Sequence, residues 1–208
     1  EDGIDVLSEC TKVVATGYGR IAVDFADYVI TEITCHARGG KEMAGDHCSI
    51  IDVGGQDTKV ILVENGMVQD FLMNDKCSAG TGKFLEIMAN RLGVTLQELF
   101  DMADAGTVLP ISSLCTVFAE SEVINYIGEG RKREDIAAGV VDSVAAKVAQ
   151  LSQKKKLSGK IILTGGLSDS RYFTKILSEK IGQTVESTRR GRYAGALGAA
   201  LLAEEKSR

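Results

Sequence analysis

Glycines at the ends of apolar runs are the feature of this chain that most restricts its fold. Two apolar runs, residues 49–53 and 160–163, each lead into a pair of glycines. The chain has 23 glycines but a single proline, Pro110. Glycine adopts turn conformations that other residues rarely adopt. We therefore predict strands that end in tight turns, within a layered α/β domain built on a mixed sheet.

The spacing of apolar residues predicts the individual elements. We predict strands at 12–15, 49–53, 58–63, 67–73 and 160–163, with Asn65 and Gly66 as a hairpin turn. Helical spacing predicts helices at 23–37, 83–92, 116–127, 134–151, 172–181 and 195–203. Thr95 and Glu98 have the spacing of a capping box, which predicts another helix start.

Composition excludes several classes of function. The 208 residues are 44% hydrophobic and 25% charged, as in an ordinary globular chain of one or two domains. The net charge of −5 argues against a nucleic-acid partner, despite the short basic run at 154–156. No apolar stretch approaches the ~18 residues of a membrane span, so we expect no membrane partner. Five scattered cysteines favour a reducing compartment, and we predict a cytoplasmic protein.

The first glycine turn lies in the sequence IDVGGQDTK, residues 51–59. Glycine lets backbone N–H groups approach an anion closely, so Gly54 and Gly55 are candidates for holding a phosphate. Asp52 or Asp57 offers a carboxylate for a hydrated Mg²⁺. A tight hairpin with an acidic tip explains these residues equally well.

Two further glycine turns support a nucleotide site. The sequence AGTG at 79–82 precedes a predicted helix, and free amides at a helix N-terminus bind anions. The sequence LTGG at 163–166 leaves a predicted strand. Each turn alone is also explained as an ordinary cap or turn. Three of them in one α/β chain favour a nucleotide, although neither the GxxxxGK[ST] motif nor a strand leading into GxGxxG is present.

Cys77 and Cys115 each precede a predicted helix. The helix dipole there stabilises negative charge, and the thiolate is the form of cysteine that binds metals. Two thiolates are too few for a structural zinc or an iron–sulfur cluster, which take four ligands. A two-fold dimer would bring four thiolates around one [4Fe–4S] cluster. From spacing alone, packing of free thiols explains the pair more simply.

Six blocks of the chain carry a resemblance to a known family: ATGYGR at 15–20, IDVGGQDTK at 51–59, NDKCSAGTGKF at 74–84, CTVFAESEVI at 115–124, LTGG at 163–166 and GALGAALLA at 195–203. On these blocks the chain resembles the BadF/BadG/BcrA/BcrD-type ATPases, which activate 2-hydroxyacyl-CoA dehydratases and include the ATPase subunits of benzoyl-CoA reductase. The blocks that contain the two cysteines are specific to that family, whereas the last two also occur across the actin, Hsp70 and sugar-kinase superfamily.

The resemblance implies an α/β, actin/Hsp70-like (ribonuclease-H-like) ATPase fold with ATP or ADP and Mg²⁺ in a cleft between two lobes. It implies a cofactor site at Gly54, Gly55 and Gln56 in the second phosphate loop, at Gly80, Thr81 and Gly82 beside it, and at Gly165 and Gly166 in the adenosine turn. It also implies that Cys77 and Cys115 are metal ligands of one [4Fe–4S] cluster shared across a homodimer. No catalytic residue is identified, and Glu120 and Glu122 receive no role.

The chain departs from the family at its beginning. The family opens with a phosphate loop of the type GIDxGST about fifty residues before the block ATGYGR, and nothing like it precedes Lys12. We expect a complete second lobe and a truncated first lobe, cut from a longer protein. The expected division is a remnant of the first lobe at 1–48, the second lobe at 49–190 and a C-terminal helix at 191–208.

The family's activity implies two kinds of partner beyond the homodimer. A reduced ferredoxin or flavodoxin would load the cluster, and a dehydratase or reductase component would receive one low-potential electron. Two other functions stay open from the residues alone. One is a sugar or acid kinase of the same superfamily, with the cysteines as packing, and the other is a non-catalytic ATP-sensing module.

Overall fold

A computed structural model gives the structure of the chain and describes residues 12–111 and 115–207. Its strands are β1 (Val14–Ala15), β2 (Tyr28–Val29), β3 (Cys48–Val53), β4 (Thr58–Glu64), β5 (Met67–Asn74), β6 (Lys160–Gly165) and β7 (Val185–Ser187). Its helices are α2 (Glu32–Ala44), α3 (Gly82–Leu92), α4 (Leu96–Ala105), α5 (Thr116–Gly128), α6 (Arg133–Ser152), α7 (Arg171–Ile181) and α8 (Ala194–Glu205). Short 3₁₀ turns lie at Arg20–Ala22 and Gly191–Tyr193.

The main sheet has five strands in the order β5-β4-β3-β6-β7. Strands β3, β4 and β5 form an antiparallel meander, whereas β6 runs parallel to β3 and β7 runs parallel to β6. A separate two-stranded sheet pairs β1 with β2 in parallel. The structure therefore confirms the predicted mixed sheet and the α/β class.

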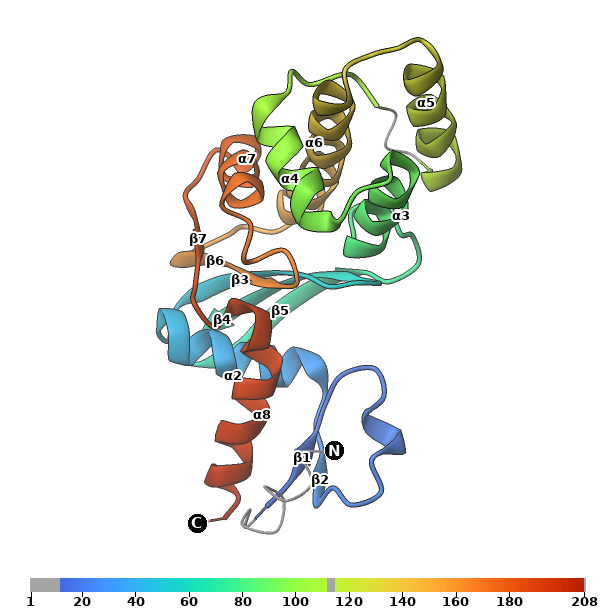
Figure 1. Ribbon diagram of the computed structural model, residues 1–208. Coiled ribbons are helices and arrows are strands. Elements are labelled where there is room, and N and C mark those ends of the chain that lie inside the picture. Colours follow the sequence, from blue (N-terminus) through green and yellow to red (C-terminus); the bar gives the residue numbers. More distant parts are fainter. Residues whose placement is uncertain (1–11, 112–114, 208) are drawn as a thin grey trace.

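Helices cover both faces of this sheet (Figure 1). Helices α3 to α7 pack on one face, where Ile51 and Val53 of β3 join the larger apolar core. Helix α2 packs on the other face against a smaller core that includes Cys48 and Ile50, and α8 lies alongside α2. Alternate residues of β3 therefore point to opposite layers, as the pleat of a strand requires.

The helix predicted at 23–37 is wrong in its first half. Residues 28–29 form β2 instead, and α2 begins at Glu32 with the Thr31 hydroxyl accepting the amide of Thr34. The apolar spacing in the first part of the stretch 23–37 was a false signal, because β2 is fixed by pairing with β1. Strand β7 was not predicted, since its three residues are too few to show a pattern.

The other predicted elements match the structure closely. The capping box of Thr95 and Glu98 begins α4, and Gly93 ends α3 in the left-handed conformation. Helix α2 falls within the predicted remnant of the first lobe, residues 1–48, but it packs on the main sheet. The predicted division between two lobes at 48/49 therefore stays a prediction. Across the described ranges, no helix combines the length and the apolar character that a bilayer crossing requires.

Candidate functional site: a glycine-lined edge joined to two cysteine loops

Two of the three glycine turns lie at the same edge of the sheet. Strands β3 and β6 are parallel, with Val53 opposite Gly165, so Gly54 and Gly166 both follow at their carboxyl ends. The backbones approach so closely that a Cβ on Gly165 would lie 2.4 Å from the Val53 carbonyl oxygen. Gly165 also has a φ of +83°, so this turn requires glycine. Ligands of open α/β sheets bind at this kind of edge.

The hairpin between β3 and β4 leaves its tip open to a ligand. The Gly54 amide donates to the Asp57 carbonyl at 2.9 Å and closes the turn. Gly55 and Gln56 at the tip are exposed, as is Gly166 on the neighbouring turn. The backbone of these three residues is accessible at one edge, which suits the phosphate and adenosine roles expected for them.

The third glycine turn has a different role from the one expected. The amides of Gly82 and Lys83, the first of α3, donate to the carbonyl oxygens of Gly54 and Gly55 at 2.9 and 2.8 Å. Those two amides are therefore committed to the hairpin and are not free to hold a phosphate. Gly80 and Thr81 are buried. The turn at 79–82 thus attaches α3 to the hairpin between β3 and β4 and does not leave these two amides open to an anion.

The two cysteines lie differently with respect to their helices. Cys115 is the N-cap of α5, as predicted, and is partly exposed. Cys77 is exposed, but α3 begins five residues later at Gly82, with Thr81 as its N-cap. The prediction that Cys77 sits at a helix N-terminus is therefore wrong, because the turn at 78–81 intervenes.

A hydrogen bond joins the two cysteine loops. The hydroxyls of Ser78 and Thr116, each next to a cysteine, lie 2.7 Å apart. The two helices are joined again at Arg91 of α3 and Glu120 of α5, which form an ion pair. Glu120 therefore links the cysteine-bearing segments. The structure brings Cys77 and Cys115 to one part of the surface, as a shared metal site requires.

The loop that carries Cys77 and the hairpin between β3 and β4 line one cavity. Its volume is about 420 Å³, and Gly55 and Gln56 of the hairpin line it together with Cys77 and Ser78. The expected nucleotide residues and an expected metal ligand are thus direct neighbours, which their separation in the sequence did not reveal.

The remaining described cysteines do not suit metal binding. Cys35 and Cys48 are fully buried. Burial raises the pKa of Cys35 and raises that of Cys48 to about 11, so both remain thiols at neutral pH. Exposed Cys77 and partly exposed Cys115 are therefore better suited as ligands. Four thiolates require a second copy of this pair.

Sequence reasoning missed a buried polar cluster beneath the hairpin. The Lys59 ammonium lies 2.7 Å from Asp57, 3.3 Å from Glu32 and 3.6 Å from Asp52. His36 lies between Glu32 and Asp52, at 3.6 and 3.5 Å. The available signal was a lysine inside the otherwise apolar strand at 58–63.

The cluster pairs one buried lysine with three carboxylates, Glu32, Asp52 and Asp57. Glu32, His36 and Asp52 offer ligand atoms within 4.8 Å of one another, but the Lys59 ammonium already supplies a positive charge to both carboxylates. Burial alone lowers the pKa of Lys59, and the carboxylates outweigh this and raise the pKa above its usual value. The Thr164 hydroxyl donates to Asp52 at 2.8 Å and ties the cluster to β6.

Comparison with known proteins agrees with this geometry. The sequence model of the BadF/BadG/BcrA/BcrD ATPase family matches residues 5–203. The chain is 43% identical over 196 residues to the (R)-2-hydroxyglutaryl-CoA dehydratase activating ATPase of Acidaminococcus fermentans, covering 93% of this chain and 75% of that protein. It is 31% identical over 202 residues to a subunit of benzoyl-CoA reductase from Thauera aromatica, covering 93% and 71%.

The fold matches a solved structure of the same kind. The activator of the 2-hydroxyisocaproyl-CoA dehydratase from Clostridium difficile, with bound ADPNP, superposes with a TM-score of 0.90 at 41% identity. The match covers 94% of this chain and 74% of the other. The predicted actin/Hsp70-like fold is thereby confirmed, and the chain belongs to the BadF/BadG/BcrA/BcrD ATPase family.

Proposed function

We propose that this chain is an ATP-dependent electron-transfer activator that holds a [4Fe–4S] cluster across a homodimer in the cytoplasm. Its acceptor is a dehydratase or reductase component that acts on a CoA thioester, and its donor is a ferredoxin or flavodoxin. The names of the relatives support the acceptor, and the ADPNP bound to one of them supports ATP or ADP as the ligand.

One observation carries the proposal. The Gly54 and Gly55 carbonyls accept the first amides of α3, and Ser78 beside Cys77 bonds to Thr116 beside Cys115. These hydrogen bonds, together with the short backbone segment 78–82, link the expected phosphate loop to both cysteine loops. This link would let the nucleotide state act on the positions of both cysteine loops.

One set of residues binds the nucleotide, and another set, linked to it by these bonds, positions the cysteine loops. The backbone at Gly54, Gly55 and Gln56 receives the phosphates, and Gly165 and Gly166 receive the adenosine. Mg²⁺ would be held through water by the partly exposed Asp57, because Asp52 is buried. Nucleotides change the arrangement of α3 and α5 only if ATP and ADP favour different arrangements of the hairpin. The hairpin is bonded directly to α3, so a shift of its carbonyls displaces the loop that carries Cys77.

The cysteines suit the cluster by their chemistry. Cys77 and Cys115 are accessible and close to each other, and a second copy supplies the other two thiolates. When bound, the cluster stores and releases one low-potential electron. The chain's own contribution is to keep the four sulfurs at a surface that both a donor and an acceptor can reach.

The test is anaerobic reconstitution of the protein with iron and sulfide. We expect four iron and four sulfide per dimer by the cubane stoichiometry, a brown absorption band and a dimeric mass. Cys77→Ala and Cys115→Ala each remove the cluster while leaving the circular dichroism spectrum unchanged.

Cys48→Ala is the matched control, because it removes a buried thiol on the other side of the sheet and should retain full iron content. A wild-type protein that stays colourless and iron-free after reconstitution would refute the proposal. Retention of iron by both surface-cysteine variants would also refute the assignment of the ligands.

A further inference from the structure

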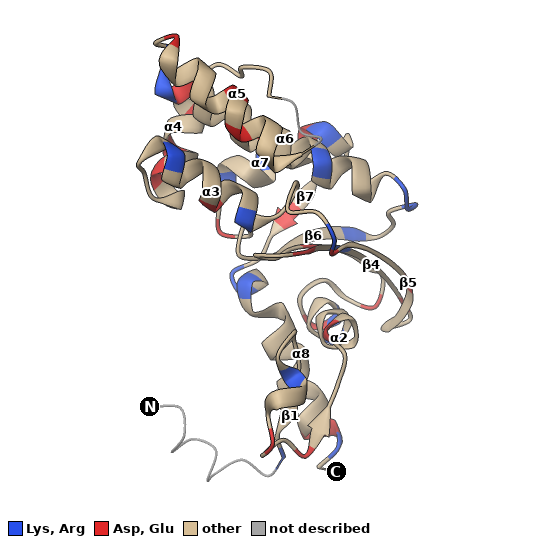
Figure 2. Ribbon diagram, turned by 90° about the vertical axis from the view of Figure 1, so that its right-hand side faces the viewer, with Lys and Arg blue, Asp and Glu red and all other residues tan. Residues whose placement is uncertain are grey.

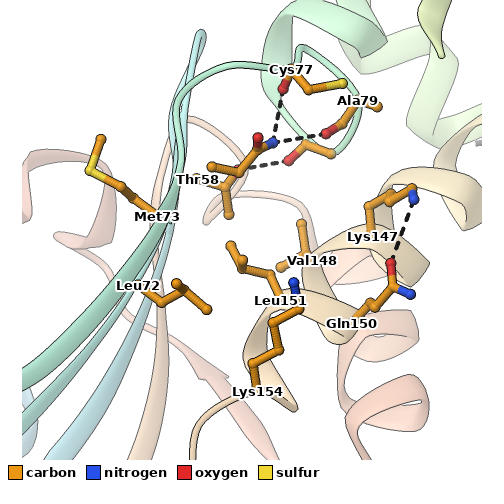
Figure 3. Close-up of a pocket in the computed structure, with 12 residues that line it drawn as sticks. Thr58, Leu72, Met73, Cys77, Ala79, Lys147, Val148, Gln150, Leu151 and Lys154 are labelled. Atoms are coloured by element: carbon orange, nitrogen blue, oxygen red, sulfur yellow. Dashed lines mark hydrogen bonds between the residues drawn. The ribbon is translucent and has the colours of Figure 1, made fainter. Parts of the chain in front are cut away.

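A second cavity opens beside Cys77, between the outer strand β5 and helix α6 (Figure 3). Its volume is about 270 Å³. We call it the lysine pocket, and it is lined by Thr58, Leu72, Met73, Asn74, Cys77, Ala79, Gly80, Lys147, Val148, Gln150, Leu151 and Lys154. Leu72, Val148 and Leu151 give it an apolar lining, and it contains neither Gly55 nor Gly166 of the nucleotide edge.

The charge of the lysine pocket is wholly positive. None of its twelve described lining residues carries a carboxylate, and the side chains of Lys147 and Lys154 both reach it (Figure 3). The side chain of Lys147 contacts the neutral Gln150 amide at 3.5 Å. Lys154 is exposed, whereas the adjacent Lys155 is neutralised by Asp70.

This positive pocket contrasts with the rest of the chain. The net charge is −5, yet basic residues mark the loop that follows α6 (Figure 2). In the sequence, the basic run at 154–156 neither indicated a function nor ruled one out. Its first member now lies in a pocket that shares Cys77 with the proposed metal site. A positive patch on a protein of negative net charge directs a negatively charged partner to that patch.

We propose that the lysine pocket is the docking site of the acidic protein that donates electrons. This rests on the proposed function, in which Cys77 is a cluster ligand. The partner presents a carboxylate to Lys147 and Lys154 and an adjacent apolar side chain to Leu72 and Leu151. In the docked complex one electron leaves the donor, which is oxidised, and reduces the [4Fe–4S] cluster by one electron, with no bond made or broken.

The pocket suits a protein better than a free small anion. Its apolar lining with two lysines matches the hydrophobic core and polar rim of a protein interface, where an apolar side chain of the partner is buried and a carboxylate lies at the edge. Its position beside Cys77 brings the donor to the cluster. Electrostatic attraction raises the rate of association between such partners.

The test compares two double variants with equal changes in net charge. Lys147→Glu/Lys154→Glu reverses the pocket, and Lys156→Glu/Lys160→Glu reverses two exposed lysines outside it. The probe is a ferredoxin of negative net charge. Its affinity in the oxidised form is measured by calorimetry, and its rate of reducing the activator is measured by stopped flow at several salt concentrations.

We expect the pocket variant to lose about tenfold or more in affinity and in second-order rate at low salt, and to lose most of the salt dependence. The control should stay within about twofold. Saturating dithionite should reduce the same amount of cluster in all three proteins, which shows that the cluster is intact.

Three results would overturn this proposal. They are an unchanged affinity in the pocket variant, equal losses in both double variants, and conversion of the pocket variant to a monomer in sedimentation, which would make this face a contact between two copies. Calorimetric binding of oxidised ferredoxin does not require a cluster, so docking can be judged even if reconstitution shows that the protein holds no iron.

Discussion

Lys59 is a buried lysine that is held by several ion pairs. Its side chain is 2% exposed and reaches three carboxylates on α2, β3 and the hairpin. Buried charges persist only when they are paired. Because Glu32 and Asp57 are each within 3.3 Å of the ammonium, the lysine neutralises negative charge directly beneath the phosphate hairpin.

Replacing Lys59 with Met tests this at the residue scale. The change leaves carboxylates buried without their cation, so we expect a loss of about 3–5 kcal/mol in the free energy of unfolding. Urea unfolding followed by circular dichroism measures it. Lys160→Met, which removes an exposed lysine from β6, is the control and should change stability by less than about 0.5 kcal/mol. Equal stability of the two variants would contradict the role given to Lys59.

At the scale of elements, α2 and α8 touch backbone to backbone. A Cβ on Gly198 would lie 1.8 Å from the Cys35 carbonyl oxygen, and one on Gly39 would lie 2.1 Å from that of Ala194. Small residues let two helices approach this closely. The run GALGAALLA therefore reflects a helix crossing, in addition to the superfamily resemblance that it carries.

Gly198→Ala tests the crossing. The added methyl meets backbone atoms that cannot rotate away, so the helices must separate, and we expect a loss of about 1–3 kcal/mol in thermal or urea unfolding. Gly128→Ala is a matched helical change with no atom within 4 Å of the new Cβ. It should be neutral or stabilise by up to about 1 kcal/mol. A Gly198→Ala protein as stable as the wild type would show that the crossing tolerates a wider spacing.

At the scale of the whole molecule, strands far apart in sequence assemble the nucleotide edge. The pairing of β3 with β6 places Val53 opposite Gly165, 112 positions along the chain. The same edge holds α3 through two amide hydrogen bonds. This edge therefore joins β3, β6 and α3, which are far apart in the sequence.

Gly166→Ala separates folding from ligand binding at this edge. Gly166 has no neighbouring atom within 4 Å of an added Cβ, so stability should change by less than about 0.5 kcal/mol. If adenosine lies against the turn, the methyl occupies its space, and we expect the dissociation constant of ADP to rise about tenfold, equivalent to roughly 1.4 kcal/mol. Calorimetry with Gly128→Ala as the control measures it. Unchanged ADP affinity would place the adenosine elsewhere.

Local patterns predicted most elements but not their partners. The capping box at Thr95 and the turn at Asn65 depend on neighbouring residues, so the sequence shows them directly. The strand β2, which replaces the first half of the helix predicted at 23–37, and the unforeseen β7 depend on pairing with other strands. The candidate site followed the same rule, since the sequence offered its glycines and cysteines as candidates but did not show the cluster around Lys59.

The sequence by itself determined the residue types of the site, because glycine turns and thiols are defined by their own chemistry. Only the tertiary structure decided what they do together. The amides of Gly82 and Lys83, expected to be free for an anion, bond to the Gly54 and Gly55 carbonyls instead. Which donor meets which acceptor depends on strand order and layer packing, and neither is encoded in any short stretch of chain.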